Sequence, residues 1–313
     1  NWTKMLQRIK KAVKGDENGD KEPSDDGHAD EEEWVVIDTD DAIDEANVAR
    51  VKRVKAKSRN EVKGKRVKDE DFEQARQKEL QSFKDTGTYV EVPYEGQHVI
   101  SSRWVHTLKL LDDGGTKAKA RLVARGFEDP ELGSLLTASP TCGRGMYRLA
   151  VQLCANRGWV PSCIDITTAF LQGEPLNRDV YLAPPRGYAD DDVVWKLLKG
   201  VYGLSDAPRK WYLKVAKVFR ELKSQQVPFD QAFFFWTDAD GVLMGIITVH
   251  VDDFYWGGTE DFDKKIMSRI RKIFPVGKER RGDFIYCGLM HRTEELGGGK
   301  LRITIDQHAY VTS

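Results

Sequence analysis

The stretch GIITVHVDDFYWGG, residues 245–258, decides the fold of this chain. An apolar run ends in the adjacent carboxylates Asp252 and Asp253, resumes as the aromatic residues 254–256, and stops at two glycines. This pattern predicts a β-hairpin with acidic residues at its tip. Because side chains alternate across a strand, only one of the two acids can aim at a given point. A divalent metal ion at the tip therefore needs a carboxylate from another element.

Asp165 is the best candidate for that second carboxylate. It ends the apolar stretch 159–164 and precedes Thr167-Thr168, where the pattern turns. Carboxylates suit magnesium, which takes oxygen ligands and retains several waters. These residues alone leave a second interpretation open, in which 252–253 is a solvated hairpin turn and Asp165 is a helix cap.

A series of short blocks extends along the rest of the chain. The blocks are Arg103-Trp104-Val105, KARLVARGF at 119–127, DITTAFLQG at 165–173, Val180-Tyr181, Pro184-Pro185, Tyr202-Gly203-Leu204, Ala207-Pro208-Arg209 with Trp211-Tyr212, and Val251-Asp252-Asp253. In order and spacing, over roughly residues 88–310, the chain resembles the reverse transcriptase domain of copia-type long-terminal-repeat retrotransposons. It departs from the family at His250, where Tyr is usual, at Ser205-Asp206, where Lys-Gln is usual, and over residues 128–141.

The fold class expected from periodicity is α+β. Apolar spacing predicts helices over 72–83, 146–153 and 211–222, the second ended by Gly158 and the third opened by Pro208. Strands are expected near 103–111, 117–126, 159–166, 242–250 and 254–257, with a closing pair around 284–290 and 300–305 and a hairpin turn at 297–300. Antiparallel hairpins mixed with helices favour α+β over an alternating parallel sheet. The resemblance implies a fingers-and-palm polymerase core, with an antiparallel palm sheet and packed helices.

The N-terminal part of the chain is highly charged. Residues 16–45 hold fifteen acids and one base, whereas residues 50–68 hold ten Lys or Arg and one acid. Apart from the island at 34–37, neither block has apolar periodicity, so we expect residues 1–68 to be a disordered tail. The basic run is either a solvated linker or a nuclear-import or nucleic-acid-contacting segment. We assign 69–295 to fingers and palm and 296–313 to the start of a truncated thumb or connection.

Other functional classes find no support in the sequence. There is no apolar run of membrane-spanning length and no signal-peptide pattern, so we expect no membrane association. The four cysteines lack zinc-binding spacing and are expected to be reduced and mostly buried. The start at Asn1 suggests a fragment or processed product. With the family resemblance, we expect an intracellular location, in a cytoplasmic particle, the nucleus or both.

The resemblance implies nucleotidyl transfer. Two magnesium ions about 4 Å apart, with manganese as a possible substitute, would activate a primer hydroxyl and offset charge on the phosphates. We assign Asp165 and Asp252 as bridging ligands, Asp253 as a supporting ligand, and the backbone carbonyl of Ile166 as a further donor. All three carboxylates are assigned as catalytic.

Strand periodicity places cations on one face of the segment 117–125 and Ala118, Ala120, Leu122 and Ala124 on the other. The turn 112–115 would close its hairpin. One interpretation is that the cationic face is a solvated edge of the sheet. The other is that it binds the phosphates of the template backbone and of the incoming triphosphate. With the resemblance, the expected nucleotide-binding residues are Lys119, Arg121, Phe170, Tyr202 and Gly203, and the expected nucleic-acid-binding residues are Lys117, Arg125, Arg209, Tyr286, Cys287 and Gly288. Core packing is an alternative for Phe170 and for 286–288, and a plain helix N-terminus is the alternative for 202–203.

The function predicted is an RNA- and DNA-templated DNA polymerase that depends on magnesium. Its partners would be a primed RNA or DNA template and deoxynucleoside triphosphates. In a full element, integrase and RNase H regions would belong to the same polyprotein. The alternatives are a catalytically decayed or domesticated nucleic-acid-binding module, and another two-metal nucleotidyl or phosphoryl enzyme on a similar fold.

Overall fold

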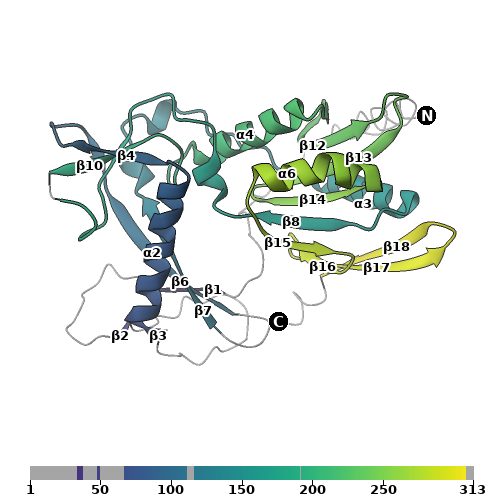
Figure 1. Ribbon diagram of the computed structural model, residues 1–313, viewed down its shortest axis with the longest axis horizontal. Coiled ribbons are helices and arrows are strands. Elements are labelled where there is room, and N and C mark those ends of the chain that lie inside the picture. Colours follow the sequence, from purple (N-terminus) through teal and green to yellow (C-terminus); the bar gives the residue numbers. More distant parts are fainter. Residues whose placement is uncertain (1–33, 38–47, 50–66, 111–115, 191, 308–313) are drawn as a thin grey trace, which may run out of the picture.

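A computed structural model describes residues 34–37, 48–49, 67–110, 116–190 and 192–307. The stretch 245–258 forms the expected antiparallel hairpin, which consists of β13 (Leu243–His250) and β14 (Asp253–Gly258). This hairpin lies in a six-stranded sheet of order β11-β12-β13-β14-β8-β15. The other members are β8 (Ser162–Ile166), β11 (Gln225–Val227), β12 (Asp230–Thr237) and β15 (Val276–Arg281). This sheet is the centre of the second lobe, on the right in Figure 1.

The two faces of the six-stranded sheet bury different side chains because neighbours along a strand point to opposite sides. Ile164 and Phe254 pack in one cluster with α4 (Ala207–Glu221) and the helical stretch after β14. Cys163 and Tyr255 pack in the other with α3 (Arg144–Arg157) and the last strands. That helical stretch comprises α5 (Glu260–Phe262), the π-helix η4 (Asp263–Met267) and α6 (Ser268–Ile273). The last strands, β16 (Phe284–Tyr286), β17 (Leu289–Gly297) and β18 (Lys300–Asp306), form their own sheet.

The first lobe, on the left in Figure 1, is built from two smaller sheets and one long helix. Helix α2 (Asp69–Asp85) lies along β7, and its Phe72 and Phe83 are fully buried. One sheet has the order β1-β6-β7, with β1 (Trp34–Ile37), β6 (Ser102–Leu110) and β7 (Thr116–Ala124). The other has the order β4-β10-β9-β5, with β4 (Tyr89–Pro93), β5 (Val99–Ile100), β9 (Tyr181–Leu182) and β10 (Val193–Leu197).

The α+β class is confirmed, together with all three helices expected from periodicity. Pro208 lies in the first turn of α4, where its fixed φ suits a helix start. Gly158 caps α3 with a left-handed φ of 65°. Strand β8 is shorter than expected and begins at Ser162 rather than near 159. The turn at Gly297–Gly299 joins β17 to β18 as expected.

Several elements were absent from the sequence expectations. Strand β12 carries the continuous run AFFFW, which lacks alternation because the strand is buried on both faces. Of the expected disordered tail, the structure describes 34–37, 48–49 and 67–68. The segment 34–37 pairs with β6, and β2 (Val48–Ala49) pairs with β3 (Val67–Lys68). The rest of 1–66 and the turn 112–115 lie outside the described residues.

Three further expectations concern boundaries, membranes and thiols. The expected domain boundary at 295/296 falls inside β17 and remains a prediction. None of the described helices is long and apolar enough to cross a membrane. All four cysteines are free; Cys154 and Cys163 are buried, whereas Cys142 and Cys287 are only half-buried.

Candidate active site

The tip of the β13–β14 hairpin is held in an unusual backbone conformation. Val251 has a φ of 54°, which is uncommon for a β-branched residue and occurs mostly where surrounding contacts enforce it. Two hydrogen bonds hold the tip here. The indole Nε1–H of Trp211 donates to the Val251 carbonyl at 2.7 Å, and the amide of Ile166 donates to the Asp252 carbonyl at 2.9 Å. The tip is therefore anchored to α4 on one side and to β8 on the other.

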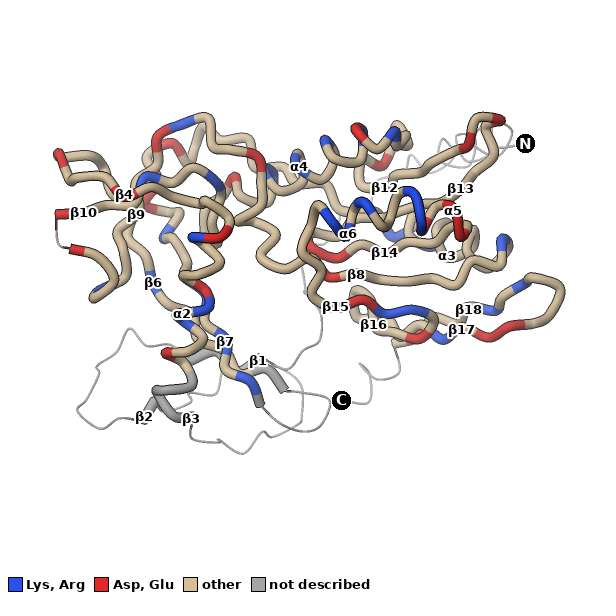
Figure 2. Tube along the Cα trace, viewed as in Figure 1, with Lys and Arg blue, Asp and Glu red and all other residues tan. Residues whose placement is uncertain are grey.

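The same arrangement brings the three predicted carboxylates to adjoining strand ends. Asp165 on β8 is the direct antiparallel partner of Asp253 on β14, and directly opposed side chains lie on the same face of a sheet. Asp252 is one residue away, in the turn bonded to Ile166. Figure 2 shows acidic positions at these ends of β8 and β14. The metal-ligand and catalytic roles assigned to the acids remain predictions.

Two of these acids interact electrostatically with a lysine on β7, in the first lobe. The surrounding protein atoms partly desolvate the Lys119 ammonium, and this desolvation and the neighbouring Arg121 lower its pKa, while Asp165 and Asp252 act in the opposite direction. The phenol of Tyr202 also responds to both acids, although burial is the main cause of its raised pKa. Lys119 and Tyr202 therefore lie within electrostatic reach of the same two carboxylates.

The donor set is compatible with magnesium. Asp165 and Asp252 offer carboxylate oxygens, and backbone carbonyls adjoin them, which suits a hard cation better than thiolate or imidazole would. No group of three His, Cys, Asp or Glu within the described ranges is arranged as a ready-made cage. Magnesium does not require one, because it is commonly held by one or two carboxylates plus substrate phosphates and water.

Strand β7 has the two faces that its sequence predicts. Ala120, Leu122 and Ala124 are almost fully buried. On the other face, Lys117 and Lys119 are exposed and Arg121 and Arg125 are half-buried. Figure 2 shows these basic positions recurring along β7.

Phe170 and Tyr202 form a small cluster with Arg121 of β7. The rings of Phe170 and Tyr202 meet edge-on with centroids 5.2 Å apart, and the Arg121 guanidinium lies 5.2 Å from the Tyr202 ring centre. Phe170 reaches this position because the chain turns after Asp165. Thr168 is left-handed, with a φ of 52°, and precedes the short helix η3 (Ala169–Gln172). Phe170 is half-buried and also packs against two core clusters, which agrees with the core-packing alternative. Its contact with the nucleotide sugar stays a prediction.

Gly203 makes a close backbone approach, and its partner is strand β7. It has a φ of 91°, and a Cβ there would lie 2.0 Å from the Ala124 carbonyl oxygen. The Ala124 amide donates to the Tyr202 carbonyl at 2.8 Å. This contact joins the end of β7 to the start of α4. The predicted contact of Gly203 with a template base remains a prediction.

The predicted primer-holding residues form a turn between β16 and β17. Tyr286 is buried and stacks on Tyr147 at 5.4 Å, whereas Cys287 and Gly288 both have positive φ. Arg209 on α4 donates to the Ala138 carbonyl at 3.0 Å, which ties the segment 128–141 to this helix. Core packing thus accounts for Tyr286, and the predicted nucleic-acid contacts remain untested.

Sequence reasoning missed three residues of the site. Gly277 on β15 leaves room for Asp165, because a Cβ there would lie 2.5 Å from Asp165 Oδ2. Glu79 on α2 is buried and accepts from the Leu122 amide of β7 at 3.3 Å. Trp211 anchors the hairpin tip. Of these three residues, only Gly277 carries a signal in the sequence, because a glycine inside a strand often marks the close approach of another group.

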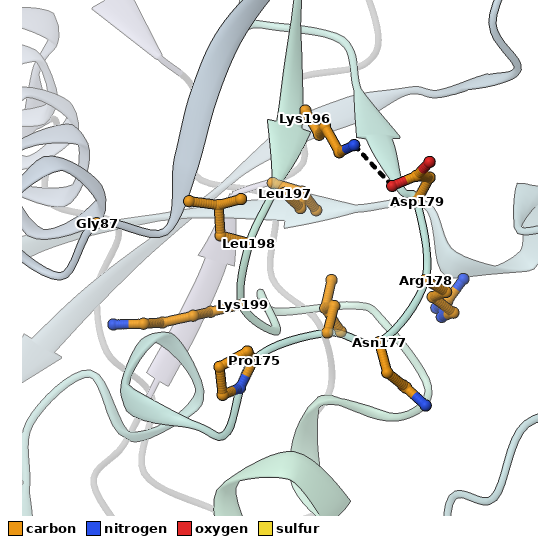
Figure 3. Close-up of a pocket in the computed structure, with 10 residues that line it drawn as sticks. Gly87, Pro175, Asn177, Arg178, Asp179, Lys196, Leu197, Leu198 and Lys199 are labelled. Carbon is orange, nitrogen blue, oxygen red and sulfur yellow. Dashed lines mark ion pairs between the residues drawn. The ribbon is translucent and has the colours of Figure 1, made fainter.

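A cavity of about 640 Å³ lies elsewhere, at the edge of the first lobe, and contains none of the predicted site residues. It is lined by residues 175–179 and 196–199 together with Gly87. In Figure 3 the Lys196 ammonium meets the Asp179 carboxylate at its rim, at 2.7 Å. The candidate site, at the strand ends that carry the half-buried Asp165, Asp252 and Asp253, lies outside this cavity.

The family of the chain follows from comparison with known proteins. A family model for reverse transcriptase (RNA-dependent DNA polymerase) matches residues 84–275, so the chain belongs to that family. The predicted copia-type relationship is confirmed by Pol polyproteins of plant transposons. The retrovirus-related Pol polyprotein from transposon RE1 of Arabidopsis thaliana is 32% identical over 62% of this chain and 14% of its own length. The equivalent polyprotein from transposon TNT 1-94 of Nicotiana tabacum is 31% identical over 63% of this chain and 15% of its own length.

The chain thus spans about a seventh of these curated relatives. A solved structure, of the foamy viral protease-reverse transcriptase in complex with double-stranded DNA, is 15% identical with a TM-score of 0.41. That match covers 71% of this chain and 34% of the solved one.

Proposed function

We propose that this chain is an RNA-directed DNA polymerase that extends the 3′-hydroxyl of a primer with deoxynucleotides on an RNA or DNA template. The observation that carries the proposal is the position of Asp165, Asp252 and Asp253 at adjoining strand ends, where Asp165 and Asp252 interact electrostatically with Lys119. Membership of the reverse transcriptase family supports it. In this proposal the first lobe is the fingers and the second lobe is the palm.

Each part of the site has a role in the proposed reaction. Asp165 and Asp252 would hold two magnesium ions, which when bound activate the primer hydroxyl and offset charge on the transferred phosphate, and manganese could replace them. Asp253 and the Ile166 carbonyl would support these ligands. Lys119 and Arg121 would bind the triphosphate, because cations offset phosphate charge and Arg adds directional hydrogen bonds. Tyr202 and Phe170 would lie beside the sugar.

The surrounding partners are also proposals. The substrates would be a primed template and deoxynucleoside triphosphates. Integrase and RNase H regions would lie in the same polyprotein, and the element would work inside the cell, in cytoplasmic particles, the nucleus or both. Lys117, Arg125, Arg209 and the turn 286–288 would contact the template and primer.

A primer-extension assay tests the proposal. The wild-type chain should extend a primer on an RNA template with magnesium or manganese, and a chelator should stop it. Asp252→Asn should abolish extension and keep the fold, because the amide cannot supply the anionic oxygen. Asp240→Asn, in the exposed turn between β12 and β13, is the matched control and should extend normally. Unchanged extension by Asp252→Asn would remove that residue from the mechanism. Binding without extension in the wild type would favour the non-enzymatic module.

A further inference from the structure

Phe127 has the most exposed side chain among the large hydrophobic residues of the described chain, at 74% of its possible area. It is the middle residue of the short 3₁₀ helix η1 (Gly126–Glu128), directly after β7. Its ring makes no aromatic or cation contact with any residue that the structure describes. An exposed phenyl ring remains in water at a cost unless a partner covers it.

The residues on either side of Phe127 are firmly held. Gly126 is buried, and a Cβ there would lie 2.1 Å from the Gly203 carbonyl oxygen. The Glu128 carboxylate accepts from both the amide and the hydroxyl of Ser101, each at 2.7 Å. These contacts fix the backbone of η1 on both sides of the ring.

Asp129, the residue that follows η1, is also held in place by side-chain contacts. Asp129 is buried and accepts two hydrogen bonds from the Arg178 guanidinium, at 3.0 and 2.7 Å. The turn therefore presents Phe127 rigidly, so a partner that covers the ring does not have to order the backbone. Rigid presentation of an aromatic side chain lowers the entropic cost of binding.

The position of the ring indicates the chemistry of the partner. Phe127 adjoins the contact between Gly126 and Gly203, and it follows Arg125 and the strand that carries Lys119 and Arg121. An exposed ring thus follows a strand with a cationic face. Proteins bind single-stranded nucleic acid with the same combination, in which cations contact phosphates and aromatic faces stack on bases. A base inside a duplex is covered on both faces by its stacked neighbours, so it has no free face for such a contact.

We propose that Phe127 is a stacking platform for an unpaired base of the template strand at the junction of the two lobes. This inference rests on the proposed function, because it takes the strand bound there to be a template. Stacking is tolerant of sequence, since every base has an aromatic face. Phe127 should therefore add affinity without base preference and without a change in the number of phosphate contacts.

Binding of a fluorescent thymidine oligonucleotide to the full chain, without metal or nucleotide, tests the inference. Phe127→Ala should weaken binding by about 5- to 100-fold, the range expected when one base no longer stacks. Phe127→Tyr should bind as the wild type does. The salt dependence of Kd should not change, because the substitution removes no cation. With an abasic oligonucleotide of equal length, Phe127→Ala and wild type should bind equally.

Leu136→Ala is the matched control, because Leu136 lies in the same segment and is 73% exposed but is not aromatic. It should bind as the wild type does. The inference is overturned if Phe127→Ala binds like the wild type, or if Leu136→Ala is equally weakened. If light scattering shows that the wild type is a dimer and that Phe127→Ala is a monomer, the ring would instead belong to an interface between two copies of the chain. Because this assay involves no catalysis, its outcome is independent of whether Asp252→Asn abolishes extension.

Discussion

Glu79 places a carboxyl group where few carboxyl groups are found, in the packed layer between α2 and β7. Burial raises its pKa from the usual 4.5 to about 7, although the Leu122 amide, Arg121 and Lys119 all act in the opposite direction. The folded chain therefore keeps a proton on Glu79 between about pH 4.5 and 7, whereas the unfolded chain does not. The contribution of Glu79 to stability is therefore greatest below this window and falls as pH rises through it.

Glu79→Gln should remove that fall. Glutamine keeps an oxygen for the Leu122 amide but does not ionise, so at pH 8 the variant should have a free energy of unfolding about 1–3 kcal/mol above wild type. Near pH 4.5 the difference should vanish. Urea denaturation at both pH values measures this, with Glu95→Gln in an exposed loop as the control. An equal difference at both pH values would show that ionisation of Glu79 is not responsible.

Phe170 raises a question that one substitution can answer. If its ring excludes a 2′-hydroxyl, Phe170→Val should raise ribonucleotide incorporation by an order of magnitude or more, at about 1.4 kcal/mol per tenfold. If it only fills the core, the same change should cost about 1–3 kcal/mol of stability and leave sugar preference unaltered. Its half-burial and its contact with Tyr202 are compatible with both. Measuring incorporation ratios beside thermal unfolding decides, and a less stable variant with unchanged selectivity refutes the exclusion role.

At the scale of elements, buried ion pairs join the lobes. The Arg178 guanidinium, before β9, contacts Asp129 after η1 at 2.7 Å and Asp206 before α4 at 3.3 Å. All three side chains are at most 9% exposed. Asp206 is the residue directly before α4, so the network ties the start of that helix to Arg178.

Arg178→Met should cost about 3–5 kcal/mol, because it leaves two carboxylates buried without a cation. Adding Asp129→Asn and Asp206→Asn to that variant should recover part of that stability, since the uncompensated charges disappear. Urea denaturation measures both. The control is Arg302→Met, which breaks an ion pair with Glu294 that is 60% exposed or more on both sides and should cost less than about 1 kcal/mol. If Arg178→Met also cost less than about 1 kcal/mol of stability, the ion-pair network would not contribute to holding the two lobes together.

Elements were predictable from the sequence where the signal is local. The helix 211–222 and the hairpin 245–258 carry their periodicity within one stretch, and the structure confirms both. Strand β12 was missed because a strand buried on both faces shows no alternation. The Arg178 network could not be foreseen, because its partners are 49 and 28 residues away along the chain. The three acids were assigned by motif, but only the structure gives the register that sets Asp165 opposite Asp253.

The formal net charge of the whole molecule is −1, but the charges around the candidate site differ in sign between the two lobes. The acids of the candidate site lie at the strand ends of the second lobe, and the cations lie along β7 in the first lobe (Figure 2). A polyanion held between the lobes would meet both, with metal ions needed on the acidic side and direct phosphate contacts available on the basic side. Nucleic-acid affinity should therefore depend on β7 through charge and not through base identity.

Replacing Lys119 and Arg121 together by Ala should weaken binding equally across template sequences. The slope of log K against log salt concentration should fall by about one unit for each phosphate that the variant no longer neutralises. The full chain suits this comparison, because the basic run 50–68 contributes equally to variant and wild type. Lys264→Ala with Lys265→Ala removes the same charge from the helical stretch after β14, where both side chains are ion-paired and exposed, and should leave the slope nearly unchanged. If both double variants changed the slope alike, overall charge would explain the binding, and β7 would be an ordinary solvated face.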